Sequence, residues 1–89
     1  MKMLIHEFSE YLRIEKRHSQ HTVEGYCRDL RRLHKALPDA EVSSLTTAQI
    51  RGFLLLLRDE GLSASSIARS LSSIKSFFRY LCEDKQLKV

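Results

Sequence analysis

The sequence has few of the residues that interrupt regular structure or cross-link a chain. Its 89 residues include three Gly, one Pro, two Cys and no Trp. Gly and Pro mark turns, and no stretch alternates convincingly between polar and apolar residues, so the pattern favours helices over a β-sheet. Two cysteines do not make a disulfide framework, which excludes a small scaffold held together by disulfides.

A long apolar run is also missing. The longest spans residues 53–57, whereas a membrane-spanning helix needs about 20 residues. The first residues reach acidic side chains at Glu7 and Glu10, so they lack the apolar region of a secretory signal. We therefore expect no membrane contact and a cytoplasmic protein, in which Cys27 and Cys82 are reduced and buried.

The length and composition fit one small globular domain. Hydrophobic residues make up 43% of the chain and charged residues 29%, a balance that excludes intrinsic disorder. A chain of this size buries roughly 60–65% of its unfolded surface, which supports a single modest core. Most enzymes need more chain to enclose an active site, so we expect a module and not a complete catalyst.

Apolar residues recur at helical spacing in four segments, each with recognisable end signals. Ser19 and Ser63 are predicted N-caps, Thr46 and Gln49 form a predicted capping box, and Gly61 suits the end of the third helix. The predicted helices span about residues 3–17, 20–37, 47–60 and 64–83. We expect one all-α, compact four-helix bundle without internal repeats, in which residues 86–89 fray or lead into something else.

The fourth helix has the clearest apolar stripe. Its residues advance by four, three, four and three positions: Ile67, Leu71, Ile74, Phe78 and Leu81. This spacing predicts that these five side chains form the face that packs into the core.

Positive charge is concentrated in the second and fourth helices. Residues 18–38 contain four basic and two acidic residues, and residues 61–82 contain three basic residues and no acidic one. Seven of the eleven serines lie between Ser63 and Ser76, although Ser is a middling helix former. Opposite or beside the predicted apolar stripe we place Ser65, Arg69, Ser72, Ser73, Lys75, Ser76 and Arg79. Short hydroxyls beside arginine suit close contact with a polyanion; the alternative is an ordinary solvated helix face, and we expect Arg69 to point away from the core.

The second helix shows a similar polar face, which contains His21, Gly25, Arg28 and Arg32. A glycine inside an exposed helix costs about 1 kcal/mol relative to alanine, so Gly25 indicates either a close approach by another surface or a tolerant position. Two basic faces with small residues together favour a nucleic acid as the ligand.

No pattern of enzyme chemistry is present in the chain. His18 and His21 are three residues apart, but neither they nor the other histidines show the spacing of a metal site, and the glycines do not form a phosphate loop. We expect no metal and no cofactor. The alternative function is a helical protein-protein interaction module, because Leu55 and Leu56 make the third helix apolar nearly all round; we expect these two leucines to be buried within the bundle.

Two runs of residues carry a family resemblance. Residues 19–30 read S-x-x-T-x-x-x-Y-x-x-D-L, and residues 69–81 read R-x-L-S-S-I-K-S-F-F-x-Y-L. Both runs, in this order and at this separation, resemble the N-terminal core-binding domain of tyrosine recombinases, especially the Xer type and related phage integrases. The resemblance covers essentially the whole chain.

The resemblance implies a SAM-like orthogonal bundle of four or five helices that forms half of a clamp around duplex DNA. Its second and fourth helices would cross the major groove. Carried over by position, the DNA contacts would be His21, Thr22, Gly25, Arg28, Ser65, Ser66, Arg69, Ser73, Lys75 and Arg79. The polar faces add Arg32, Ser72 and Ser76 to these candidates.

The catalytic half of such recombinases, with its His-x-x-Arg box and nucleophilic tyrosine, does not match this sequence. No His is followed three residues later by Arg, and Tyr80 belongs to the fourth-helix motif. We therefore expect this chain to bind DNA without catalysis, as the N-terminal part of a cofactor-independent recombinase. The resemblance implies double-stranded DNA and other recombinase subunits, in a tetramer on DNA, as partners, and integration or chromosome-dimer resolution as the process.

Overall fold

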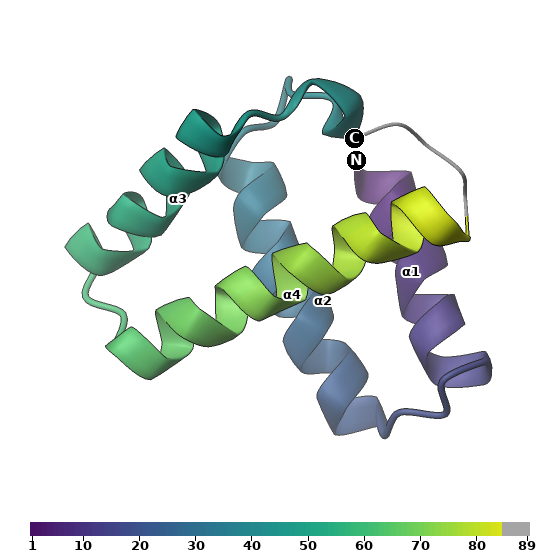
Figure 1. Cartoon of the computed structure of the whole chain (residues 1–89). Coiled ribbons are helices and arrows are strands. Elements are labelled where there is room, and N and C mark those ends of the chain that lie inside the picture. The colour runs from purple at the N-terminus through teal and green to yellow at the C-terminus, as the bar shows by residue number, and fades with distance from the viewer. Residues whose placement is uncertain (85–89) are drawn as a thin grey trace.

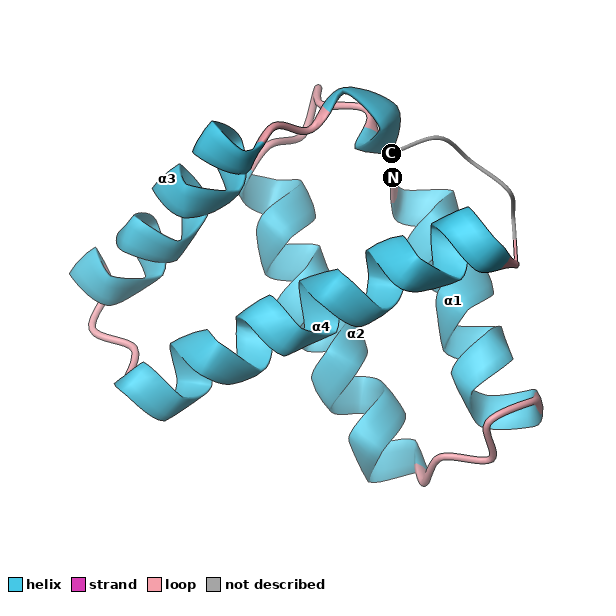
Figure 2. Cartoon of the chain, in the orientation of Figure 1, coloured by secondary structure: helices cyan, strands magenta, loops and turns pink. Residues whose placement is uncertain are grey.

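The computed structural model describes residues 1–84 of the 89 and shows an all-α bundle in that range (Figures 1 and 2). This confirms the predicted fold class. The elements are α1 (Lys2–Ile14), α2 (Gln20–Ala36), the 3₁₀-helix η1 (Val42–Ser44), α3 (Thr47–Asp59) and α4 (Ala64–Glu83). The expectation for residues 86–89 lies outside the described residues.

The predicted helix ends are confirmed by their hydrogen bonds. The side chain of Ser19 caps α2 and that of Ser63 caps α4. Thr46 and Gln49 form the reciprocal capping box at the start of α3, with bonds of 2.9 and 3.1 Å. Gly61, which follows α3, takes a φ of 91°, a left-handed conformation that costs glycine little because it has no Cβ.

The first helix is shorter than predicted. It ends at Ile14 instead of Arg17, and the Arg17 backbone has a φ of 55°. The amide of His18 donates to the Leu12 carbonyl at 3.0 Å, which turns the chain toward the Ser19 cap of α2. Helical spacing alone missed this turn because the segment contains no glycine to mark it.

The helices form two layers. The helices α1 and α2 pack against each other, and α4 crosses in front of both (Figure 1). The third helix packs mainly against α4 and extends the bundle on one side. As a result, the two most basic helices, α2 and α4, cross directly over one another.

The core is centred on aromatic side chains from α1 and α4. Phe8 is 1% exposed and lies within 5.2–6.2 Å, between ring centroids, of Tyr11, Tyr26, Phe77 and Tyr80. Buried leucines from α2, α3 and α4 surround this cluster. Aromatic rings bury large areas, so this cluster fixes how α4 lies on α1.

The buried face of α4 is rotated relative to the prediction. Ile67, Leu71 and Phe78 are half-buried, although Ile74 and Leu81 are buried as expected. The other buried side chains of α4 are Ser70, Ser73, Phe77 and Tyr80. The rotation places two aromatic rings in the core and two small serines where α4 crosses α2. It also leaves Cys82 exposed, which corrects the prediction that both cysteines are buried.

Candidate nucleic-acid interface

A hollow of about 340 Å³ lies between α2 and α4. It brings together seven of the residues predicted from the sequence, which come from segments more than 40 positions apart: His21, Thr22, Gly25, Arg28, Arg69, Ser72 and Ser73. The crossing of the two helices therefore gathers the polar faces of both into one concave surface.

Asp29 is buried beside this hollow and was not among the predicted site residues. Its side chain has no exposed area and accepts three hydrogen bonds from α4. Arg69 donates from Nε to Oδ2 at 3.2 Å and from Nη2 to Oδ1 at 3.0 Å, and the Ser73 hydroxyl donates to Oδ2 at 2.9 Å. A signal was present in the sequence: Asp29 is an acidic residue directly beside Leu30 in the apolar stripe of the second helix, and such a residue needs a partner when it is buried.

The orientation of Arg69 corrects one prediction. We expected the side chain to point away from the core, but it lies across α2 and pairs with Asp29, with 47% of its surface still exposed. The hydrogen bonds to Asp29, and then its negative charge, raise the pKa of Arg69 above its already high value. The guanidinium is therefore permanently charged and held at the hollow.

The prediction that Ser73 lies on the exposed side of α4 is wrong. Ser73 is 2% exposed, because its hydroxyl is used by Asp29 and because the core face of α4 is turned toward Phe77. Among the other serines, Ser65 and Ser72 are exposed, and Ser66 and Ser76 are half-buried.

The first turns of α2 and α4 are built in the same way. Ser19 accepts the amide of Thr22 at 3.2 Å and donates its hydroxyl to Thr22 Oγ1 at 3.0 Å. Ser63 makes the same two contacts with Ser66, at 3.2 and 3.0 Å. Thr22 and Ser66 therefore each accept a hydrogen bond from the cap serine. The proton of their own hydroxyl group is not used by the cap and can be donated to another acceptor. Helix N-termini carry partial positive charge, so both first turns suit contact with an anion.

Gly25 lines the hollow without being required by the packing of the chain. A Cβ at this position would meet a single neighbour, the flexible Nη2 of Arg28, at an ordinary 3.8 Å. The helix therefore has space for alanine here, and the cost of glycine has no cause within the described residues.

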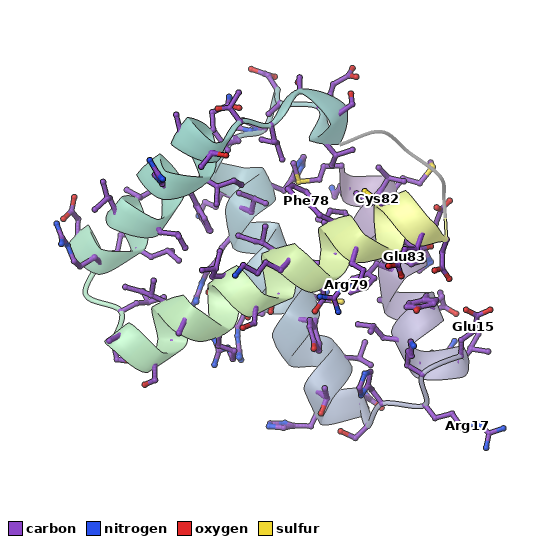
Figure 3. The ribbon with its side chains drawn as sticks, viewed as in Figure 1. Glu15, Arg17, Phe78, Arg79, Cys82 and Glu83 are labelled. Atoms are coloured by element: carbon purple, nitrogen blue, oxygen red, sulfur yellow. The ribbon has the colours of Figure 1, made fainter. Side chains whose placement is uncertain are left out.

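Two of the remaining predicted residues lie in a neighbouring hollow. Ser76 and Arg79 line a second hollow with Lys16, His18 and Glu83, which adjoins the first at Tyr26. Figure 3 shows Arg79 among the side chains of the C-terminal half of α4, whereas Arg17 extends outward from the turn after α1.

Arg32 and Lys75 are not gathered into either hollow. Arg32 is half-buried one turn beyond Arg28 on α2, where it lines a hollow with Phe53 and Leu56 of α3. Lys75 is exposed on α4. The sequence pattern placed both on polar faces, but the structure separates them from the crossing.

The third helix presents a different surface. Leu55 is 51% exposed and Leu56 is 43% exposed, so the prediction that both are buried within the bundle is wrong. The helix lies at the side of the bundle and packs mainly against α4, which leaves these two side chains toward solvent.

Other chemistry is sparse in residues 1–84. No group of three His, Cys, Asp or Glu side chains in this range is placed to hold a metal ion, and no helix there is long and apolar enough to cross a membrane. Burial raises the pKa of the Cys27 thiol, against opposing effects of Arg31 and Ser9, so Cys27 is a neutral core residue.

Comparison with known proteins adds a family to this geometry. Residues 5–85 match the family model for the phage integrase N-terminal SAM-like domain. The chain is 38% identical to the tyrosine recombinase XerD of Listeria monocytogenes over 98% of its length, and 33% identical to XerD of Oceanobacillus iheyensis over 96%. It is 36% identical to the tyrosine recombinase XerC of Azotobacter vinelandii over 86%.

The chain spans about a third of the length of these relatives, with 31%, 30% and 27% of each protein covered. No solved structure matches the chain.

Proposed function

The chain belongs to the family of phage integrase N-terminal SAM-like domains, and on this premise we propose that it binds duplex DNA through the face that α2 and α4 form where they cross. In this proposal the chain is the DNA-gripping part of a site-specific tyrosine recombinase. It contributes no catalytic residue, and the relatives' recombinase activity belongs to the whole protein.

One observation carries this proposal: the concave surface between α2 and α4 combines two arginines, hydroxyl groups and a glycine, and of its two acidic residues, Glu24 and Asp29, the second is buried under Arg69. Arg28 and Arg69 supply the positive charge, and Thr22 and Ser72 supply hydroxyl groups. Gly25 has no side chain, so another molecule can approach the α2 backbone there. Phosphate contacts by arginine and hydroxyl groups fix a protein on duplex DNA, and arginine also reads guanine in the major groove. A surface with these groups fits a polyanion better than an apolar ligand or a protein core.

The two helix N-termini extend this face. Thr22 and Ser66 each lie in the first turn of their helix, and their hydroxyl groups accept from the cap and so keep their own protons for another acceptor. We assign these turns, together with Arg28 and Arg69, to the phosphate backbone, and Gly25 and Ser72 to the major groove between the backbone contacts. Lys75, Ser76 and Arg79 then follow the duplex along α4, next to Lys16 and His18.

The whole protein, in this proposal, assembles with other recombinase subunits on DNA and exchanges strands without an energy cofactor. Integration of a mobile element and resolution of chromosome dimers are both consistent with the named relatives, since XerC and XerD are tyrosine recombinases.

A second candidate function rests on α3. The exposed Leu55 and Leu56 form an apolar surface on the outer helix, as expected of a helix that docks against another protein. In a protein-protein interaction module of this kind, the hollow between α2 and α4 would have no ligand.

A salt titration of DNA binding separates the two candidates. The chain is mixed with a fluorescently labelled duplex of mixed sequence, and anisotropy is measured from low to moderate salt. The slope of log K against log salt should be clearly negative, because cations on the protein release counterions from DNA. An affinity that does not change with salt would contradict the proposal and favour the module.

A matched pair of variants locates the binding surface. Arg28→Gln and Arg51→Gln each remove one positive charge, but Arg28 lines the hollow whereas Arg51 is exposed on α3. If Arg28 contacts a phosphate, Arg28→Gln should reduce the magnitude of the slope by about 0.9, and Arg51→Gln should leave it unchanged. Equal effects would show that only the total charge matters.

A further inference from the structure

Two acidic residues line the hollow, Glu24 and Asp29, and Asp29 is the buried one, which the proposed DNA-binding face does not explain. It lies fully buried beside a surface that would meet a polyanion, where a negative charge opposes binding. Burial of an ion pair is also weak grounds for stability, because a well-packed apolar pair of similar volume is often as stable or more stable. The position of Asp29 therefore needs a reason besides the stability of the fold.

The geometry of the pair shows what Asp29 does to Arg69. The carboxylate takes one N–H from Nε and one from Nη2 of the guanidinium, at 3.2 and 3.0 Å. A guanidinium has five N–H groups in a fixed plane, so three of them remain, all on its two terminal nitrogens. Because 47% of the Arg69 side chain is exposed, the unused edge is accessible from the hollow.

The carboxylate itself is held on two sides. Ser73 donates its hydroxyl to Oδ2 at 2.9 Å from one helical turn beyond Arg69, and the Asp29 side chain has no exposed area in which to move. A long arginine side chain normally samples many rotamers, and ordering it on binding costs free energy. Fixing the plane of the guanidinium before binding removes most of that cost.

We propose that Asp29 is a positioning residue: it holds Arg69 by one edge of the guanidinium while the opposite edge contacts a phosphate of the duplex, so that Arg69 binds both groups at once. This inference rests on the proposed DNA-binding function and adds to it a buried acidic residue that strengthens binding to an anion. The pair persists in the DNA complex, and Ser73 supports it without touching DNA.

The direction in which Asp29→Asn changes DNA affinity tests the proposal. Asp29→Asn removes a negative charge, so an effect through charge alone would tighten DNA binding. Positioning predicts the opposite: affinity for a mixed-sequence duplex should fall about fivefold, the size of effect expected when one long side chain has to be ordered on binding. Binding by Asp29→Asn as tight as, or tighter than, that of the unmodified chain would overturn the proposal.

A double-variant cycle separates positioning from a general loss of folding. In an Arg69→Met background, Asp29→Asn should no longer weaken DNA binding, because the group that Asp29 positions is gone and only the effect of charge remains. Each variant is first checked for folding by circular dichroism. If Asp29→Asn does not fold, Ser73→Ala replaces it; this change removes one of the three hydrogen bonds of the carboxylate and should weaken binding in the same direction by a smaller factor. Unchanged binding by a folded Ser73→Ala would count against the proposal.

An NMR measurement on the unmodified chain tests whether the pair persists in the complex, and a variant is needed only to assign the signal. The Nε–H signal of Arg69, assigned by its loss in Arg69→Met, should be protected from exchange by Asp29, and it should stay protected when the duplex is added. Loss of this protection on DNA binding would show that Arg69 leaves Asp29, and the proposal would fail. If the unmodified chain does not bind the duplex at all, the proposed function fails instead, so the two failures are distinguishable.

Discussion

The two halves of α4 have different roles in the structure. In residues 64–73 the fully buried side chains are Ser70 and Ser73, and Arg69 is held by a carboxylate from α2. In residues 74–83 the inward side chains are Ile74, Phe77, Tyr80 and Leu81, which pack against the Phe8 cluster. The second half fixes the helix by burial of apolar area, and this lets the first half carry polar groups that stabilise the fold much less.

A small domain can hold a charged side chain beside its core when another part of the same helix supplies the apolar packing. Phe77 is fully buried 5.4 Å from Phe8, whereas Arg69 is only half-covered and lies over a buried carboxylate. Changes in the aromatic half should therefore affect stability first, and changes in the polar half should affect DNA binding first.

The largest expected effect is in the aromatic half. Phe77→Ala should lower the free energy of unfolding by about 3–5 kcal/mol, because the cavity cannot fully collapse around Phe8 and Tyr80. Phe78, which is half-buried, is the control, and Phe78→Ala should cost clearly less. Urea unfolding followed by circular dichroism measures both. A smaller loss for Phe77→Ala than for Phe78→Ala would place the core on the face that the sequence pattern first indicated.

Removal of Arg69 should have an intermediate effect. Arg69→Met leaves the buried Asp29 carboxylate with the hydrogen bond from Ser73 of α4, and an unsatisfied buried acceptor costs about 1–3 kcal/mol. The double variant Asp29→Asn/Arg69→Met should recover part of that loss, because it removes the charge as well as its partner. The melting temperatures of both variants provide the measurement. An unchanged melting temperature for Arg69→Met would mean that the pair does not form in solution.

The cap of α4 should contribute less than the ion pair. Ser63→Ala removes the acceptor of the Ser66 amide and should lower the free energy of unfolding by about 1 kcal/mol. Ser65, which lies two residues further and makes one long contact of 3.4 Å with Ser63, is the matched control. Urea unfolding should distinguish Ser63→Ala from Ser65→Ala, and equal losses would argue against a capping role.

The smallest effect on stability is expected at Gly25, with the opposite sign. Gly25→Ala meets no obstacle in the chain and should raise the free energy of unfolding by about 0.5–1 kcal/mol, through helix propensity. The same change should weaken DNA binding, because the added methyl group would stand where the duplex approaches. A variant that is more stable and binds DNA as well as before would show that Gly25 is simply a tolerated residue.

The fold was largely predictable because its signals are local. Capping by Ser19, Thr46 and Ser63 and the glycine turn at Gly61 each depend on residues within one helical turn, and all four are found in the structure. The end of α1 was not predictable, because the residue with a positive φ in the following turn is Arg17 and not a glycine.

The candidate site was predictable in composition but not in arrangement. Helical periodicity identified the polar faces that contain Arg28 and Arg69, but it treated each helix alone. The pairing of Arg69 with Asp29 joins residues 40 positions apart, and it depends on how α4 is rotated on α2. That rotation is set by Phe77 and Tyr80, whose packing against Phe8 no single-helix pattern contains.

The most direct test of the account is a titration of the isotopically labelled chain with a mixed-sequence duplex, followed through its backbone amide signals. The account predicts shifts in the first turns of α2 and α4 and around Gly25 and Arg69, with the amides of Phe77 and Leu81 and those of Leu55 and Leu56 little changed. Shifts confined to α3, or no shifts at low salt, would contradict it.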